Sequence, residues 1–376
     1  MEDRPLKTIA DLPQLVESLS PAKQELFRRI FHVSTVVGHL KPPPSMHRWI
    51  ESHFGSVEAV LAQRIVKVTN LVTWEGSLFN ELRAERPMEA RENEDIKKLI
   101  MENYGDPFCR PLEETPEDVF GRVRGKYSVT CSNIAKYDGF HGLVIFDEHD
   151  PLVFSAERVS DYIDTALAWA QEAHEVDPEA RYFFLMWNCL WKSGASIIHG
   201  HTQMTLGREM HYAKVEHLRR AAKGYEKTYG SNYFDDLYEV HSALGLGLEA
   251  GRTRLLAYLT PIKEKEVLFI SQPRWEHHGL GSNGKLRLDE DLKVAIYKVL
   301  RCFVDRLGVR SFNLAFCMPP IIEAGEDWSG FPVIVRLVDR GSLINKTADF
   351  GGMELYAASV VASDPFRLAE VLRTSL

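Results

Sequence analysis

The spacing of apolar residues changes along the chain at about residue 78. Before that point, apolar positions recur at the spacing of amphipathic helices, and Lys41-Pro42-Pro43-Pro44 is expected to end one of these helices. The expected helical segments are 12–19, a second that starts at 20–23, and 46–64, and the β-branched run 65–69 is expected to begin a strand. No residue in this region points to chemistry, so we expect residues 1–75 to serve packing or oligomerisation.

Beyond residue 78, short apolar runs typical of strands alternate with single amphipathic helices. In the first half, strands are predicted at 143–146 and 182–188, and helices at 156–175 and 211–229. The second half has strands at 254–259, 267–270, 312–316 and 332–338, with a helix at 289–307. The second half repeats the strand and helix order of the first in weaker form, which indicates an internal tandem.

Composition and charge narrow the functional classes. The chain has 376 residues with 45% hydrophobic content, which is typical of a soluble globular protein too long for one ordinary core. A net charge of -8 argues against nucleic-acid binding, so an anionic substrate would need a local basic cluster. No apolar run is long enough for a membrane helix, and residues 1–5 lack the apolar core of a signal peptide. Five cysteines are an odd number and suit a reducing compartment, so we expect a cytoplasmic protein.

The segment from Ser193 to Gln203 carries the densest chemistry in the chain. If residues 197–205 are extended, alternation places His199, His201 and Gln203 on one face. Imidazole can attack phosphorus at neutral pH because it is largely uncharged there, and the phosphoramidate that forms can be broken by a second acceptor. For a bare His-x-His pattern, a strand with two surface histidines remains the alternative.

The wider segment resembles the active-site motif of the histidine triad superfamily, in the branch of galactose-1-phosphate uridylyltransferase and its relatives. The pattern of that branch, Gly-x-Ser-x-x-His-x-His-x-Gln, is complete at residues 194–203. The resemblance implies an α+β fold with two tandem units over about 78–372, each with an antiparallel sheet and flanking helices. We predict the boundaries 1–75 for the helical extension, 76–230 for the catalytic unit and 231–376 for a degenerate second unit. Val335 and Leu337 are expected where a catalytic strand of that second unit would carry imidazoles.

The same resemblance implies a structural metal site. Cys109 lies where the branch has Cys-Pro-x-Cys, and Asp106 takes the place of the first cysteine. The set is completed by His149, in an Asp-Glu-His-Asp segment, and by His199. A carboxylate, a thiolate and two imidazoles suit tetrahedral Zn²⁺, while the carboxylate also admits Fe²⁺ or Mn²⁺.

Several residues match phosphate or nucleoside contacts of the branch. Arg83 and Arg86 lie in Arg-Ala-Glu-Arg-Pro after Asn80-Glu81-Leu82, which resembles a phosphate-gripping segment. Asn188 and Ser196 match neutral donors to the phosphoryl oxygens. Asn133 opens a segment similar to the nucleotide-side loop, so it is expected to contact the nucleoside.

Glu354 looks like the glutamate of the branch that binds a hexose hydroxyl. The glutamine expected six residues later is Val360, which cannot hydrogen-bond a sugar, so the sequence does not specify galactose. A second, iron-binding His-x-His is not expected, because that late strand reads Val335-Arg336-Leu337.

The leading hypothesis is a nucleotidyltransferase or phosphorylase that acts through a covalent nucleotidyl-His201. Its partners would be a nucleotide, nucleotide-sugar or dinucleotide donor and a phosphate-bearing acceptor, in a monomer or a homodimer. A hydrolase of the same fold is the alternative, but Gln203 favours transfer because a carboxamide cannot serve water as acid and base. A catalytically inactive nucleotide-binding module is the third hypothesis, and the intact motif counts against it.

Overall fold

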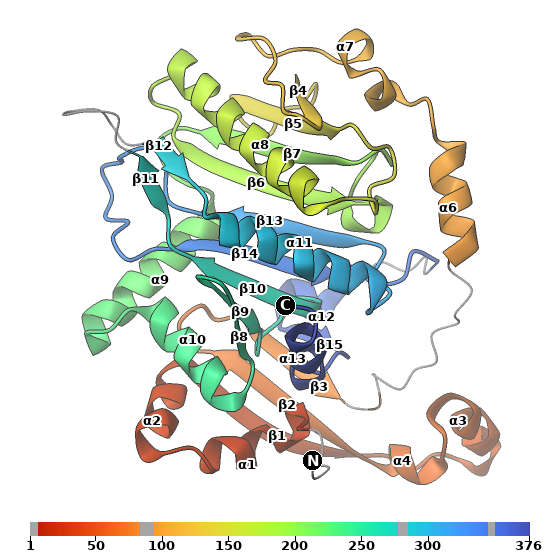
Figure 1. Cartoon of the computed structure of the whole chain (residues 1–376). Coiled ribbons are helices and arrows are strands. Elements are labelled where there is room, and N and C mark those ends of the chain that lie inside the picture. Colours follow the sequence, from red (N-terminus) through yellow and green to blue (C-terminus); the bar gives the residue numbers. More distant parts are fainter. Residues whose placement is uncertain (1–6, 81, 83–92, 277–284, 345–349) are drawn as a thin grey trace.

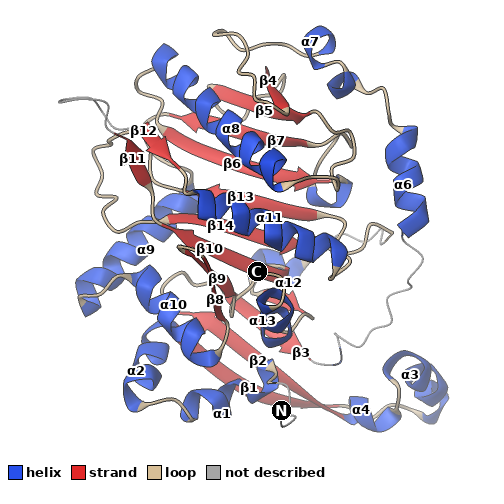
Figure 2. Ribbon diagram, viewed as in Figure 1, coloured by secondary structure: helices blue, strands red, loops and turns tan. Residues whose placement is uncertain are grey.

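One long antiparallel sheet forms the centre of the molecule (Figures 1 and 2). The computed structural model describes residues 7–80, 82, 93–276, 285–344 and 350–376. The strand order is β4-β5-β7-β6-β13-β14-β10-β9-β8. In that order the strands are β4 (Ser128–Ser132), β5 (Phe140–Phe146), β7 (His201–Gly207), β6 (Tyr182–Cys189), β13 (Phe312–Cys317), β14 (Val333–Asp339), β10 (Glu264–Ser271), β9 (Thr253–Ala257) and β8 (Gly247–Ala250).

The α+β class is confirmed, but the expectation of a separate sheet for each tandem unit is wrong. Strand β6 of the first half pairs with β13 of the second, with Met186 opposite Ala315 and Asn188 opposite Asn313. Two sheets would have left the outer edges of β6 and β13 with unpaired backbone groups. Pairing these edges with each other satisfies those groups and joins both units in one sheet.

Two long helices, α8 (Ala156–Val176) and α11 (Glu290–Asp305), lie on the same face of this sheet and pack against each other (Figure 1). Both were predicted, because each has an apolar stripe at helical spacing. Trp169 of α8 and Phe303 of α11 are fully buried in the shared core. The two helices thus cover one face of the sheet.

The N-terminal region is not purely helical. The expected helices are present as α1 (Leu12–Glu17), α2 (Pro21–Ile30), α3 (His47–Phe54) and α4 (Val57–Leu61), and the strand expected near 65–69 is β2 (Ala62–Asn70). However, α2 ends at Ile30, and the segment before the prolines is a further strand, β1 (Phe31–His39). This strand is rich in β-branched residues and pairs with β2 along its whole length. Strands β1, β2, β3 (Gly76–Asn80) and the parallel β15 (Ser359–Val361) make a second sheet.

The remaining elements surround the two sheets. The helices are α6 (Asn93–Glu102), α7 (Pro111–Glu114), α9 (Ala213–Tyr229), α10 (Tyr233–Leu244), α12 (Gly352–Tyr356) and α13 (Pro365–Arg373). Short 3-10 turns are η1 (Ile9–Asp11), η2 (Pro44–Met46), η3 (Pro107–Cys109) and η4 (Trp191–Ser193), and β11 (Arg274–Glu276) pairs with β12 (Lys285–Arg287). Among the described residues, no helix is long and apolar enough to cross a membrane.

Candidate active site

His201 opens strand β7 and faces away from the two long helices. The neighbouring Thr202 lines a small apolar cavity with Tyr162 of α8 and Ile296 of α11. Because side chains alternate along a strand, His201 and Gln203 lie on the opposite face, as expected. His199 differs from the expectation, since it lies in the loop before β7 rather than in the strand.

The glycine between the two histidines allows a close approach of the backbone to the core. A Cβ atom at Gly200 would lie 2.5 Å from the ring of Phe146. The Gly200 carbonyl accepts a hydrogen bond from the Phe146 N–H at 3.0 Å. The loop is thus held against β5 at the point where the chain passes from His199 to His201.

The ring of His201 is held in one neutral tautomer. Its Nδ1 lies 2.8 Å from the carbonyl oxygen of His199, which can only accept, so Nδ1 carries the proton. Nε2 is therefore unprotonated, and it has no hydrogen-bond partner among the described residues. The side chain is buried and meets Phe108 edge to face at 5.1 Å between ring centroids. Burial lowers the pKa of His201, which keeps the ring uncharged at neutral pH.

The four residues predicted as metal ligands converge on one point. Asp106, Cys109, His149 and His199 each offer a donor atom, and these atoms lie within 4.8 Å of one another. The Cys109 Sγ lies 3.4 Å from the Nδ1 of His149 and 3.5 Å from the Nδ1 of His199. The carboxylate oxygens of Asp106 lie 3.9 and 3.7 Å from the same two nitrogens.

The hydrogen bonds around this cluster fit a cation at its centre. The Nε2 of His149 donates to the Ile100 carbonyl and the Nε2 of His199 to the Phe146 carbonyl, each at 2.9 Å. Both Nδ1 atoms are consequently bare and point inward, which is the usual arrangement of metal-binding histidines. The Oδ2 of Asp106 is buried without a hydrogen-bond partner. A cation would satisfy all of these lone pairs at once.

Gln203 and Asn188 lie on the same face as His201. Gln203 is paired with Met186 in the neighbouring strand β6, and continuing this register by two residues places Asn188 across from His201. The Oε1 of Gln203 is 3.2 Å from the Nε2 of His141, and the Oδ1 of Asn188 accepts from the Nδ2 of Asn313 at 2.6 Å. Asn313 and the contact of His141 with Gln203 were not anticipated. A polar residue inside the apolar run 312–316 was the available signal for Asn313.

The other predicted substrate contacts have separate outcomes. Ser196 is exposed in the loop before β7. The Nδ2 of Asn133 lies 3.2 Å from the Nε2 of His141. Glu354 has no described contact with His201 or Gln203. Its carboxylate accepts the N–H of Gly351 at the start of α12. Arg83 and Arg86 lie outside the described residues.

The degenerate strand of the second unit needs a correction. Gln203, Met186, Ala315 and Arg336 form one cross-strand row, so the residues of β14 on the catalytic face are Arg336 and its alternates. Val335 and Leu337, which were expected at the imidazole positions, are buried and belong to the other face. The second unit still carries no histidine on β14, but Arg336 occupies the row of Gln203.

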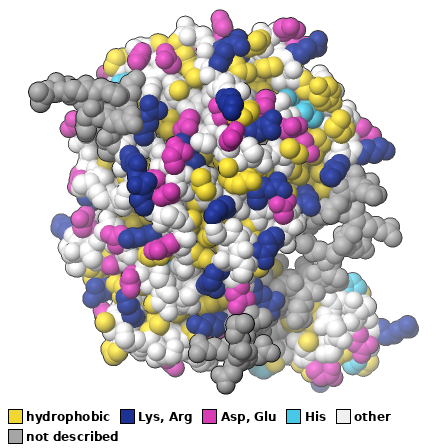
Figure 3. Space-filling view, in the orientation of Figure 1, with side chains coloured by type: hydrophobic (Ala, Val, Ile, Leu, Met, Phe, Trp, Pro, Cys, Tyr) yellow, Lys and Arg dark blue, Asp and Glu magenta, His cyan; other side chains and the backbone are white. Residues whose placement is uncertain are grey.

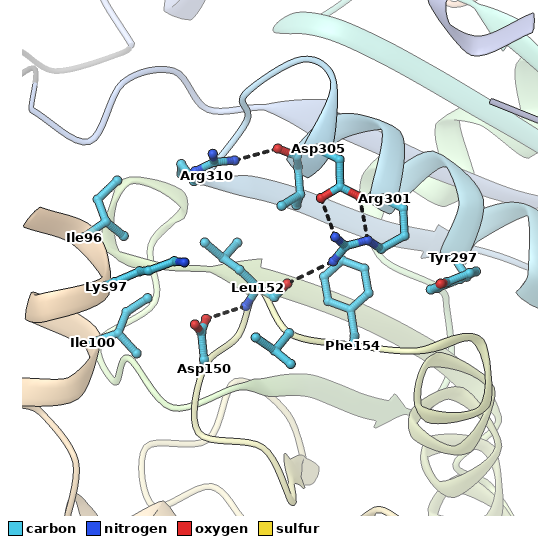
Figure 4. A pocket seen from close by; sticks show the side chains of 12 residues that line it. Ile96, Lys97, Ile100, Asp150, Leu152, Phe154, Tyr297, Arg301, Asp305 and Arg310 are labelled. Carbon is cyan, nitrogen blue, oxygen red and sulfur yellow. Dashed lines mark hydrogen bonds and ion pairs between the residues drawn. The ribbon is translucent and has the colours of Figure 1, made fainter. Parts of the chain in front are cut away.

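Neither the surface charge nor the large cleft of the molecule points to a substrate site beside His201. Acidic and basic side chains are mixed over the visible face of the molecule (Figure 3). A cleft of about 910 Å³ lies between α6, the loop after His149 and the end of α11 (Figure 4). Tyr297 and Arg301 of α11 line this cleft, so it is on the helix-covered side of the sheet and not beside His201.

Three solved structures share most of this architecture. An ADP-glucose phosphorylase from Arabidopsis thaliana with bound ADP-glucose matches with a TM-score of 0.59 and 18% identity, over 81% of this chain and 97% of the other. A GalT-like protein from Arabidopsis thaliana matches with a TM-score of 0.53 and 18% identity, over 73% and 93%. A uridylyltransferase matches with a TM-score of 0.53 and 16% identity, over 72% and 90%.

The chain has the uridylyltransferase fold. The sequence itself gives no such match, because no protein-family model and no curated protein matches it significantly. Likeness at this level of identity establishes the fold alone. Within the uridylyltransferase fold, the chemistry has to be argued from the residues of this chain.

Proposed function

We propose that the protein is a nucleotidyltransferase that works through a covalent nucleotidyl-His201. The observation that carries the proposal is the bare Nε2 of His201, on a face shared with the carboxamides of Gln203 and Asn188. A neutral imidazole can attack phosphorus, and neutral amide donors can hold phosphoryl oxygens without quenching it.

In the first step, Nε2 of His201 forms a bond to the α-phosphorus of a nucleoside diphosphate compound. The bond from that phosphorus to the bridging oxygen breaks, and the phosphate-bearing fragment leaves with the electron pair. The ring becomes cationic, and its Nδ1–H remains on the His199 carbonyl at 2.8 Å, which stabilises that charge.

In the second step, an oxygen of a phosphate acceptor attacks the same phosphorus and the P–N bond breaks. The electron pair returns to Nε2, so His201 is neutral again and no proton has left the ring. Gln203 cannot activate water, because a carboxamide does not titrate. This difference favours transfer to phosphate over hydrolysis.

The cluster of Asp106, Cys109, His149 and His199 would hold a structural cation, with Zn²⁺ preferred and Fe²⁺ or Mn²⁺ as alternatives. Bound there, the ion would fix the loop that carries His199. Because the His199 carbonyl holds Nδ1 of His201, the orientation of the nucleophile depends on this loop.

The donor is proposed to be a nucleotide sugar or a dinucleotide. The similar structures include an ADP-glucose phosphorylase and a uridylyltransferase, so ADP-glucose and UDP-glucose are the donors to test first. We assign the chemistry to residues 76–230 and a supporting role to 231–376, with 1–75 as an appendage that could join two copies in a homodimer. None of the five cysteines forms a disulfide, which suits the cytoplasm proposed for the protein.

A panel of α-labelled nucleotides and nucleotide sugars tests this function. Label that stays on the denatured protein identifies the donor, and its transfer to inorganic phosphate identifies a phosphorylase. Release of free nucleoside monophosphate when no inorganic phosphate has been added would instead favour the hydrolase.

A further inference from the structure

The two carboxamides beside His201 can each face the substrate with either end. In water the two orientations differ little in energy, but to a phosphoryl oxygen they are opposites. The NH₂ end donates a hydrogen bond, whereas the carbonyl end repels the anion. The hydrogen bonds behind each amide decide which end is presented.

Asn188 is fixed by groups from the second unit. Arg340 can only donate, and its guanidinium contacts the Oδ1 of Asn313. The Nδ2 of Asn313 consequently points the other way, where it donates to the Ser193 carbonyl at 3.0 Å and to the Oδ1 of Asn188 at 2.6 Å. The NH₂ of Asn188 is then the end left over, and it has no partner among the described residues.

Gln203 is fixed from the other side of β7. The backbone N–H of Tyr137 donates to the Nδ1 of His141 at 3.0 Å, so the proton of this ring is on Nε2. That Nε2–H has the Oε1 of Gln203 as its acceptor at 3.2 Å. The Nδ2 of Asn133 lies at the same distance, but its Oδ1 already accepts the N–H of Ala135, so the end of Asn133 that faces Nε2 is a donor and cannot replace Gln203 as the acceptor. His141 is fully buried, and burial lowers its pKa, so the ring keeps this single tautomer. The NH₂ of Gln203 is again the end left over within the described part of the chain.

We propose that Asn313 and His141 are positioning residues that turn the NH₂ groups of Asn188 and Gln203 towards the substrate. This orientation makes the site selective for an anionic phosphoryl group. Each series of hydrogen bonds, here called a relay, begins at a group that can only donate. These groups are the guanidinium of Arg340 for Asn188 and the N–H of Tyr137 for Gln203. Both relays end with the same polarity on the face of His201. The second unit thus takes part in the reaction through Asn313, although its own strand β14 has no histidine.

This inference rests on the proposed function for its ligand, so its test measures phosphate binding separately from chemistry. Binding of ADP and UDP is compared with binding of adenosine and uridine, and adduct formation is measured in parallel. Asn313→Asp removes the one side-chain donor that the described residues offer to the Oδ1 of Asn188, while it keeps a partner for Arg340. Asn188 should then turn its NH₂ towards Asp and its carbonyl towards the phosphate.

For Asn313→Asp we expect nucleoside diphosphate affinity to fall by about 10-fold or more and the rate of adduct formation by about 10²-fold or more. Nucleoside affinity and the melting temperature should change little. The decisive variant is Asn313→Asp in an Asn188→Ala background. The further loss there should be much smaller than in the wild-type background, because only the bond from Asn313 to the Ser193 carbonyl is then removed. His141→Ala should show the same coupling to Gln203→Ala.

Asn232→Asp, which makes the same change at the start of α10, is the matched control and should leave both readouts unchanged. If Asn313→Asp costs as much without the Asn188 amide as with it, the inference is overturned. It is also overturned if the wild type binds neither nucleoside diphosphate. The wild type could also prefer nucleoside diphosphates over nucleosides, with the preference lost in Asn313→Asp, and yet form no adduct. That result would contradict the proposed covalent function and support the role of Asn313 and His141.

Discussion

The Nδ1 atoms of His149 and His199 face each other at 3.1 Å, while the Nε2 of each ring donates to a backbone carbonyl. Neither Nδ1 can donate to the other, so two lone pairs would repel unless a cation lies between them. The buried, unpartnered Oδ2 of Asp106 adds a third inward-facing acceptor. This arrangement is hard to explain as an ordinary hydrogen-bond cluster.

Purified protein should therefore carry about one equivalent of a transition metal, measured by elemental analysis. His149→Ala should lose the metal and melt at a lower temperature, because the ligands of a structural site contribute folding energy. His217→Ala, at an exposed histidine of α9, is the control and should keep both metal and stability. A metal-free preparation that is fully folded and active would contradict the assignment of all four ligands.

The choice of metal should depend on Asp106. Asp106→Cys replaces a hard oxygen with a soft thiolate, so the ratio of bound Zn²⁺ to bound Mn²⁺ in a competition experiment should rise. An unchanged ratio would mean that Asp106 does not contact the ion.

Stability should fall in mild acid partly because of His241. Burial lowers the pKa of His241 from 6.5 to about 4. The unfolded chain takes up a proton more readily, so stability is fully present above pH 6.5 and is lost as the pH falls towards 4. The contribution is on the order of 3 kcal/mol.

Urea unfolding at pH 7 and pH 4.5 can measure this effect. The loss between the two pH values should be smaller in His241→Gln than in the wild type, while the exposed His39→Gln should behave like the wild type. Equal pH dependence in wild type and His241→Gln would show that His241 does not contribute.

Gln203 should decide between transfer and hydrolysis. Gln203→Ala should slow turnover by about 10² or more, because it removes one donor to the phosphoryl oxygens. Gln203→His restores a titratable group, which should shift the partition of the adduct from phosphate towards water. The ratio of the two products from one labelled donor measures this shift, and an unchanged ratio would show that residue 203 does not control the acceptor.

The sequence predicted the elements whose pattern is strong and local. Helix α8 and strand β6 were expected from their own residues, and the four metal ligands were matched because a family motif fixes their spacing. Strand β1 was missed because its β-branched residues were included in a helix that was expected to end at the prolines, and its pairing with β2, as Phe31 with Asn70, is not visible in the sequence. The joined sheet was missed for the same reason, since the β6–β13 pairing links segments more than a hundred residues apart.

Within the site, contacts between the two halves of the chain could not be predicted from the sequence. Asn188 could be matched to a family motif. Asn313, which donates a hydrogen bond to Asn188, belongs to no recognisable motif. The error over Val335 and Leu337 has a simpler physical cause. A shift of one residue exchanges the two faces of a strand, and only the register with β13 places Arg336 in the row of Gln203.

The central claim is that His201 carries the nucleotidyl group. The most direct test is to incubate the wild type and His201→Asn with an α-labelled donor and to measure label retained on the denatured protein, with its stability in acid and base. The account predicts an adduct on the wild type that is labile in acid and stable in base, as a phosphoramidate should be, and neither adduct nor turnover in His201→Asn. Turnover retained by His201→Asn, or a wild type that forms no adduct with any nucleotide of the panel, would contradict it.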